Sequence, residues 1–356
     1  MKKYIKSIKD FFSIFRILGL GKIIFLNKAH NLSLKYIRAY FVAECFKSFF
    51  EIGFFDALKT KKYIKIEEFS LVNGIDYNYL KVICDYLYAV KIMNKNKDGL
   101  YYLSRNEDFI IKYAQGPFYF INAYSPALEN MSALLNKTKT YGKDISRNEF
   151  YVSKASAETE QWVPYPIVTN LVKRFRFKSV LDLGCGSGEF IIKLSLDNPS
   201  VICHGIDISA VSIKSGINKI ESLSENAQIK INLSVLDIFR IKDFDKIKAA
   251  EIDAVISMFV LHEFLEYGNE KITRLLDDLR KTFKNSYFII CELCRNSPDE
   301  LRKKQNLISE HHLFHALSNQ KLLSRDEWRT IFATAGFKII EEIYFEPASQ
   351  SCFLLK

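Results

Sequence analysis

The stretch Val180-Leu-Asp-Leu-Gly-Cys-Gly-Ser-Gly-Glu-Phe190 decides the fold of this 356-residue chain. An apolar run, Val180–Leu183, leads directly into three glycines at alternate positions, Gly184, Gly186 and Gly188. Glycine permits the positive φ angles of a tight turn and lets a ligand approach the main chain closely. The stretch therefore predicts a buried strand, a ligand-binding turn and the start of a helix.

Outward from this turn, apolar runs and helical patterns alternate along residues 165–356. The expected strands are Ser179–Leu183, Val201–Ile206, Ile231–Leu236, Ala254–Phe259, Tyr287–Cys291, Phe337–Phe345 and Ser351–Leu355. Helical patterns at 188–196, 209–224 and 269–284 separate the earlier runs, and Ser324-Arg-Asp-Glu327 is a capping box that begins a later helix. This alternation predicts an α/β fold, with a Rossmann-like seven-stranded sheet and helices on both of its faces.

Residues 1–164 carry a mostly helical pattern instead, and Trp162-Val-Pro-Tyr-Pro166 marks the expected domain boundary. After a helical segment at 36–58, a short helix should end at Gly74 and a longer one should begin at an Asp76 cap. Two short β runs around Asp98-Gly99 follow. Helix, turn, helix and hairpin in this order are typical of a winged helix.

A winged helix suggests DNA binding, but its sequence here does not suit that role. The helix that would enter the groove, Tyr77–Tyr88, contains one Lys and one Asp. A DNA reader needs several cations to neutralise phosphates. We therefore expect no nucleic-acid partner, and a domain that dimerises or covers the substrate; a non-catalytic regulator is a remote alternative.

Most of the net charge of +10 lies in residues 1–40, where nine Lys or Arg less one acid leave +8. Arg16 interrupts the apolar run there before it reaches the ~18 residues of a membrane-spanning helix. No cleavage site follows, so we expect no export signal and no membrane span. The segment instead predicts a helix that docks on the body or on a partner subunit, with a membrane-surface helix as the alternative.

Seven scattered cysteines in a chain without an export signal indicate reduced thiols in the cytoplasm. Cys291-Glu-Leu-Cys294 is a lone CxxC with no second pair nearby, so it is a weak indication of zinc or redox chemistry.

Spacing indicates which cofactor the glycine turn binds. Asp182, Gly184, Gly186 and Gly188 form Asp-x-Gly-x-Gly-x-Gly, which differs from the G-x-G-x-x-G of pyrophosphate-binding turns. An acid at Asp182 would repel a pyrophosphate but attract the ammonium group of a methionine moiety. The turn therefore favours S-adenosylmethionine (SAM) over a dinucleotide.

Two further acids end the next two strands. Asp207, in His204-Gly-Ile-Asp207, is placed to accept hydrogen bonds from two ribose hydroxyls. Asp237 is placed for the adenine amino group, with Ile238 or Phe239 against the ring, and Ser257 ends the fourth strand as a further candidate contact. Because ligands bind at the carboxyl ends of parallel strands, these residues together predict a SAM site.

These residues resemble the small-molecule O-methyltransferases that join an N-terminal winged-helix dimerisation domain to a class I SAM-dependent catalytic domain. The resemblance covers roughly residues 35–356 and includes Gly53-Phe-Phe-Asp56, Val235–Phe239, Leu261-His-Glu-Phe264 and Glu327-Trp328. It implies a homodimer formed through the N-terminal domain and a small-molecule methyl acceptor. The aromatic residues Tyr113, Phe118, Tyr119, Phe120 and Tyr124 are candidates for the lining of the acceptor pocket, with a place in the hydrophobic core as the more common alternative.

In that family the histidine of a Leu-His-Asp-Trp-like motif removes the acceptor proton, and a carboxylate after the fifth strand orients it. His262 and Glu292 match these positions. The chain departs from the family by having Glu263 and Phe264 in place of the motif's Asp-Trp. A base of this kind suits chemistry near neutral pH, where histidine titrates.

A second histidine group leaves the reaction type open. His311, His312 and His315 lie at helical spacing, and with His262 they could form a metal site, written here as His262, His312 and His315. Some relatives that methylate the α-carbon of 2-oxo acids use a His-bound metal, so an iron or zinc ion would fit this reading. We slightly favour metal-assisted C-methylation of a 2-oxo acid over metal-free O-methylation of a phenol or another hydroxyl compound.

Overall fold

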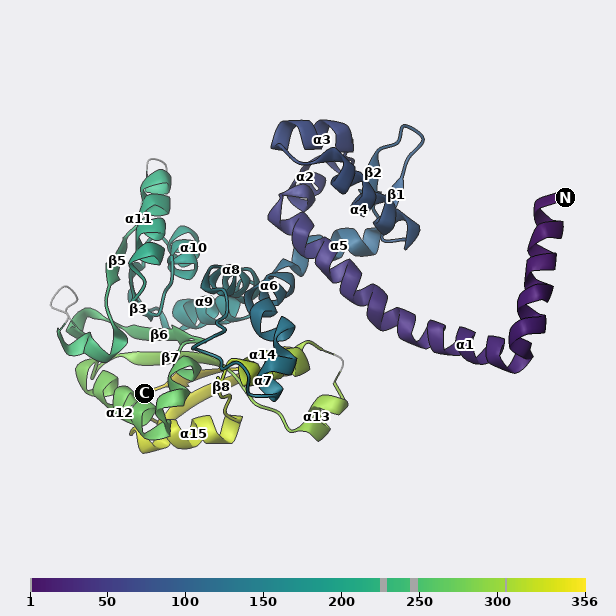
Figure 1. Ribbon diagram of the computed structural model, residues 1–356. Helices are drawn as coiled ribbons and strands as arrows, with labels where there is room; N and C mark the ends of the chain where they lie inside the picture. Colours follow the sequence, from purple (N-terminus) through teal and green to yellow (C-terminus); the bar gives the residue numbers. More distant parts are fainter. Residues whose placement is uncertain (1, 225–228, 244–248, 305) are drawn as a thin grey trace. The chain divides into compact units, whose positions relative to one another are not determined.

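The computed structural model of the chain describes residues 2–224, 229–243, 249–304 and 306–356. The chain forms two compact units, residues 1–118 and 119–356, drawn in Figure 1. The division falls before the expected boundary at 164/165 because the helices of 119–164 pack with the second unit. Tyr124 stacks on Phe314 with ring centroids 5.0 Å apart, and Arg147 pairs with Glu263.

The first unit is mostly helical. Its helices are α1 (Lys2–Glu51), α2 (Phe54–Lys61), α3 (Ile66–Asn73), α4 (Tyr77–Ala89) and α5 (Arg105–Tyr113), with strands β1 (Met93–Lys95) and β2 (Tyr101–Leu103). Gly19 interrupts the helical dihedrals of α1 at φ 72° and ψ 156°. The core of this unit is aromatic, and Phe49, Phe54 and Phe55 are fully buried.

The local signals of this unit are confirmed. Gly74 ends α3 with φ 65°, and the Asp76 side chain accepts hydrogen bonds from the main-chain N–H groups of Asn78 and Tyr79 at the start of α4. β1 and β2 pair antiparallel around Gly99, whose φ is +80°. The elements thus follow the order of a winged helix, and the role of this unit in dimerisation stays a prediction.

The second unit is a seven-stranded sheet with helices on both faces, which confirms the predicted architecture. Helices α6 (Gln115–Glu129), α7 (Met131–Leu135), α8 (Glu149–Glu160) and α9 (Pro164–Phe175) precede the sheet. The strands are β3 (Ser179–Leu183), β4 (Ile202–Asp207), β5 (Ile231–Val235), β6 (Ala254–Met258), β7 (Tyr287–Leu293), β8 (Ile339–Phe345) and β9 (Gln350–Leu355). Between and after them lie α10 (Glu189–Asp197), α11 (Ala210–Ser224), α12 (Asn269–Thr282), α13 (Pro298–Arg302), α14 (Ile308–Leu317), α15 (Arg325–Thr334) and 3-10 helices η1 (Ile238–Asp243), η2 (Ala249–Glu251), η3 (Leu261–Tyr267) and η4 (Glu346–Ala348).

The strand order is β5-β4-β3-β6-β7-β9-β8. Strands β3 to β7 are parallel, whereas β9 runs antiparallel to both β7 and β8. The order reverses at β3, so the carboxyl ends of β3 and β6 flank the point where open α/β sheets bind ligands. The glycine turn follows β3 at this point.

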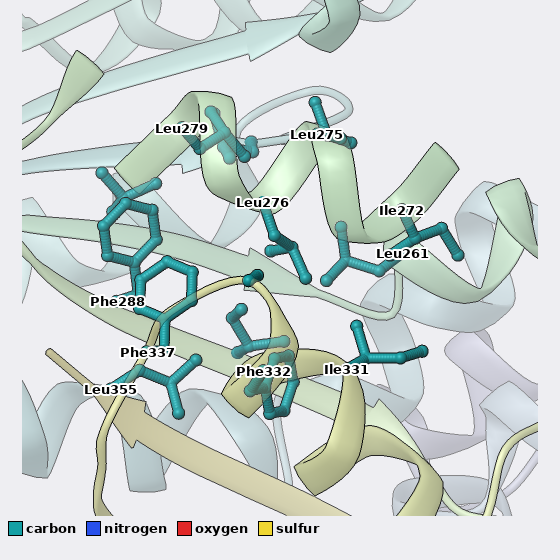
Figure 2. Close-up of a cluster of buried hydrophobic side chains, with 14 of the residues drawn as sticks. Leu261, Ile272, Leu275, Leu276, Leu279, Phe288, Ile331, Phe332, Phe337 and Leu355 are labelled. Atoms are coloured by element: carbon teal, nitrogen blue, oxygen red, sulfur yellow. The ribbon is translucent and has the colours of Figure 1, made fainter. Parts of the chain in front are cut away.

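Two hydrophobic layers fix the sheet between its helices. One layer packs α9 and α10 against β3, β6 and β9, with Val168, Leu171 and Ile191 all fully buried. The other packs α12 and α15 against the opposite face, and Figure 2 shows its side chains, among them Leu261 with Ile272 and Leu276. Leu261 is 1% exposed and directly precedes His262, so this core anchors the segment that carries the predicted base.

Among the residues that the structure describes, no helix has the length and apolarity needed to cross a membrane.

Candidate active site

The glycine turn is held by main-chain hydrogen bonds from the neighbouring strand. The N–H groups of Gly184 and Cys185 both donate to the Ile206 carbonyl, at 2.8 and 3.0 Å. Gly184, Gly186 and Gly188 have φ angles of +74°, +55° and +75°, which only glycine adopts without strain. A Cβ atom on Gly184 would lie 2.5 Å from Cγ2 of Val260, so this position also lacks space for a side chain.

The predicted cofactor acids lie at successive strand ends. Asp207 accepts hydrogen bonds from the N–H of Gly186 at 2.9 Å and of Ser209 at 2.7 Å, which ties the glycine turn to the end of β4. Asp237 accepts from the Phe239 N–H at 2.9 Å through Oδ1. Asp182 is 3% exposed, and burial together with the charges of Glu160 and Asp207 raises its pKa well above the usual value.

A cavity of about 530 Å³ opens above these residues. Its lining includes six of the predicted cofactor contacts, namely Asp182, Gly184, Gly186, Asp207, Asp237 and Ile238. Phe239 packs behind this lining on Phe264, with ring centroids 4.9 Å apart. Ser257 is 2% exposed and is absent from the described lining, so its predicted contact would need a rearrangement.

The predicted base and its carboxylate form a buried pair. His262 Nδ1 lies 2.8 Å from Glu292 Oε2, and the other oxygen of Glu292 accepts the Leu261 N–H at 2.8 Å. The two side chains are 4% and 0% exposed. A carboxylate at Nδ1 fixes the ring orientation and leaves Nε2 for the acceptor proton.

A second carboxylate faces the other ring nitrogen. Glu263 Oε1 lies 3.6 Å from His262 Nε2. Arg147 donates two hydrogen bonds to Glu263, each 3.1 Å long, and Gln320 donates a third at 2.6 Å. Arg147 and Glu263 line the cavity, so a charged pair stands between the cavity and the base.

Burial opposes a charge on the His262 imidazole, but the two carboxylates outweigh it and raise its pKa to about 10. The two carboxylates therefore favour the protonated form of His262. Burial would raise the pKa of Glu263, but His262 and Arg147 lower it well below the usual range. At this end of the site each negative charge thus has a positive partner, His262 for Glu292 and Arg147 for Glu263.

The structure separates the histidines that were expected to act together. The His262 and His315 rings lie 5.3 Å apart, centroid to centroid, whereas His312 Nε2 accepts a 3.4 Å hydrogen bond from the Asn296 main chain. His315 donates from Nδ1 to the His311 carbonyl at 2.6 Å, and burial with the nearby His262 charge lowers its pKa to about 3. The predicted set of His262, His312 and His315 is therefore not assembled.

Within the described ranges, no group of three or more His, Cys, Asp or Glu side chains could hold a metal ion. His262 and His315 together offer two imidazole nitrogens, whereas protein metal sites of this type use three or more ligands. The residues present do not fit the predicted metal.

Residues 176–336 match a family described as a methyltransferase domain. The chain is also 23% identical over 245 residues to a 2-ketoarginine methyltransferase of Streptomyces arginensis, covering 66% of this chain and 68% of that protein. The chain thus carries a methyltransferase domain and is a SAM-dependent methyltransferase. Binding of SAM by the glycine turn and by the acids at the ends of β3, β4 and β5 stays a prediction.

Solved structures share the fold of this methyltransferase. The human N-acetylserotonin methyltransferase in complex with SAM superposes with a TM-score of 0.69 at 15% identity, covering 92% of this chain and 97% of that one. The mitomycin 7-O-methyltransferase superposes with a TM-score of 0.63 at 11% identity, covering 94% and 99%. At these identities the likeness establishes architecture alone.

Sequence reasoning missed several residues of the methyltransferase site. Arg147, Glu160 and Tyr165 line the cavity although they precede the first strand of the sheet. Gln320 reaches Glu263 from the loop after α14. The replacement of the motif's Asp-Trp by Glu263-Phe264 was the available signal, because a longer acid at this position can reach a partner elsewhere in the chain.

Proposed function

We propose that the methyltransferase methylates a small molecule whose proton is removed by His262, and that the preferred acceptor is the α-carbon of a 2-oxo acid. The observation that carries the proposal is the buried His262–Glu292 pair next to the Arg147–Glu263 pair. One pair supplies a base and the other supplies a guanidinium at the cavity wall.

The base has to lose its proton before it can act. SAM brings a sulfonium and an ammonium group into the cavity, and positive charge near an imidazolium lowers its pKa. His262 Nε2 then accepts a proton from the acceptor carbon. The resulting carbanion attacks the SAM methyl group, a C–C bond forms as the C–S bond breaks, and neutral S-adenosylhomocysteine (SAH) leaves. Alignment of the two reactants supplies much of the rate enhancement.

Arg147 supports a carboxylate-bearing acceptor. Its guanidinium already makes the two-point pair with Glu263 that guanidinium groups make with carboxylates. The carboxylate of a 2-oxo acid could replace Glu263 on Arg147, which would also remove Glu263 from the neighbourhood of Nε2. The similarity to a 2-ketoarginine methyltransferase points to the same class of acceptor.

O-methylation of a phenol is the second candidate. Phe120 lies 5.1 Å from His311 in an edge-on arrangement, and Tyr124 stacks on Phe314. Such aromatic side chains suit a flat ring. The similar mitomycin enzyme is an O-methyltransferase by name. In this alternative His262 removes the hydroxyl proton and Arg147 only holds Glu263.

Labelled SAM assayed against a panel of 2-oxo acids and phenols tests these alternatives. The expected product carries the label on carbon, located by NMR. The double variant R147Q/E263Q removes both charges of the pair and leaves the exposed Glu149 without its Arg147 partner; it should lower kcat/KM for 2-oxo acids about 30-fold or more while retaining phenol turnover, if any. Methylated phenols with no labelled 2-oxo acid would overturn the preferred acceptor.

The sequence also suggested a metal ion that assists C-methylation, but no step above depends on one. With two imidazoles as its protein ligands, a metal would need oxygen atoms of the acceptor to complete its coordination. Purified protein analysed for iron and zinc, and assayed after chelation, decides the matter. Retained activity in a metal-free sample is the expected result.

We further propose that the methyltransferase is a homodimer formed through its N-terminal unit. Helix α1 exposes a run of large apolar side chains, each more than half accessible: Ile17, Leu20, Ile24, Phe25, Leu26, Leu32, Tyr36, Ile37, Tyr40 and Phe41. Apolar surface of this extent is unfavourable in water and marks interaction sites. Light scattering should give twice the monomer mass, and F25E/Y36E should lower it.

A further inference from the structure

Glu160 lines the cofactor cavity but has no place in the chemistry described so far. It is the last residue of α8. Its cavity neighbours include Tyr165, Asp182 and Glu189. The Tyr165 hydroxyl, in a side chain that is 6% exposed, donates a hydrogen bond to the Glu160 carboxylate. This hydrogen bond therefore fixes the orientation of the Glu160 side chain at the cavity wall, as expected of a ligand-binding group.

The charges around Glu160 are mostly negative. Asp182 and Glu292 repel its carboxylate, whereas the His262 imidazolium attracts it. Burial raises the pKa of Glu160 to about 8, and the Tyr165 hydrogen bond and His262 lower it only in part. The titratable groups that act on Glu160 come from four elements: Tyr165 of α9, Asp182 of β3, His262 of η3, and Glu292 and Cys291 of β7. A cation brought by a ligand would therefore be stabilised here.

The position of Glu160 in the cavity indicates which cationic group of the ligand it would contact. Glu160 interacts electrostatically with Asp182, beside the glycine turn, and with His262, at the base. The transferred methyl group must lie between these two places if an acceptor next to His262 is to attack it. The sulfonium that carries the methyl group belongs to the same part of the cavity, whereas Asp182 suits the ammonium group of the methionine moiety.

We propose that Glu160 is a specificity-determining residue that recognises the SAM sulfonium and so favours SAM over SAH. The product has a neutral sulfur in place of the sulfonium but keeps the ammonium, carboxylate, ribose and adenine groups. A carboxylate at the sulfonium therefore stabilises the substrate cofactor more than the product. The consequence for the enzyme is faster exchange of SAH for SAM, whatever the methyl acceptor is.

Calorimetric titration of SAM and of SAH into the protein tests the proposal, with Glu160→Gln compared with wild type. Wild type should bind SAM more tightly than SAH, and E160Q should reduce the SAM-to-SAH preference about tenfold or more while its SAH affinity stays within about threefold. In assays E160Q should raise KM for SAM and leave kcat at saturating SAM within about threefold. Glu158→Gln is the matched control, since Glu158 lies on the same helix and pairs with Gln161 outside the cavity lining.

Proton release provides an independent readout. Because a neutral Glu160 must ionise to pair with the sulfonium, SAM binding to wild type at pH 7 should release close to one proton more than SAH binding. Titrations in two buffers of different ionisation enthalpy count these protons. An unchanged SAM-to-SAH preference in E160Q would overturn the proposal. If E160Q binds neither cofactor form, the wild-type preference decides: it should grow as pH rises from 6 to 9, and a constant preference would also overturn the proposal.

Discussion

The two ends of the cavity are built differently. At the cofactor end the candidate ligand-binding groups are mostly main-chain atoms and short acids, and the glycine turn is secured by hydrogen bonds to the Ile206 carbonyl. At the acceptor end long side chains meet from distant segments, as in the contact of Arg147 with Glu263. The first arrangement is local to a strand and its turn, whereas the second exists only after the unit has folded.

The charges differ in the same way. At the cofactor end Asp182 is repelled by Glu160 and Asp207, and burial raises the pKa of both Asp182 and Glu160, which the charge of His262 offsets only in part for Glu160. At the acceptor end each acid has a partner, since Glu292 pairs with His262 and Glu263 with Arg147. The cofactor end is therefore suited to a cationic ligand. At the acceptor end, by contrast, Arg147 must exchange Glu263 for the acceptor or His262 must lose its proton before the reaction can proceed.

Removal of the base should have the largest effect and should fall on one end alone. His262→Ala is expected to lower kcat by about 10²- to 10⁴-fold, the usual contribution of a general base. SAM affinity should change less than about threefold, because the glycine turn and its acids remain. Stopped assays with labelled SAM and calorimetry measure the two quantities. Turnover that survives the substitution would sink the role assigned to His262.

Removal of the orienting carboxylate should change both the rate and its pH dependence. In Glu292→Gln the imidazolium loses its nearer negative partner, so the pKa of His262 should fall from about 10. Activity requires neutral His262, hence rises with pH, and a lower pKa moves this rise to lower pH. The maximal rate should drop by about tenfold to 10²-fold, since the imidazolium formed in the reaction is less stabilised. A profile that does not move, measured as kcat/KM from pH 6 to 10, would contradict the pairing.

A change at the cofactor end should affect binding and folding together. Gly184→Ala places a Cβ atom against Val260 at a φ of +74°. Strain of this kind costs about 1–3 kcal/mol. We expect a lower Tm and a roughly tenfold weaker SAM affinity, measured by thermal unfolding with and without SAM. Gly142→Ala is the control, because its φ of +87° imposes similar strain while its Cβ would meet no atom within 4 Å. Equal loss of SAM affinity in both variants would contradict the role of the Gly184 turn in SAM binding.

The sequence predicted the cofactor end well and the acceptor end only in part. Spacing along one strand and turn is enough to identify Asp182 and Gly184, and strand ends identify Asp207 and Asp237. The family motif gave His262 and Glu292, which the structure places 2.8 Å apart. The roles of these residues in catalysis and binding stay predictions.

Arg147 could not be found in the same way. It lies 116 residues before Glu263, and only folding brings the two together. Helical spacing made His311, His312 and His315 all candidates, because His315 shares a helix face with a residue four positions before it and with one three positions before it. Which of these side chains lies beside His262 depends on the packing of α14 against Tyr124, and periodicity carries no information about that.

The two histidines therefore provide the smallest and most discriminating test. His315 is 6% exposed and lies next to the His262 ring, whereas His312 hydrogen-bonds the loop at Asn296. His315→Ala should lower kcat/KM about tenfold, because it opens space beside the base, and His312→Ala should change it less than about threefold. Both substitutions remove one imidazole from the same helix, so each is the control for the other. If His312→Ala were instead the more damaging variant, with SAM affinity and Tm unchanged, the acceptor would lie on the His312 side of α14. The neighbouring His262 and His315 side chains would then have no part in binding it.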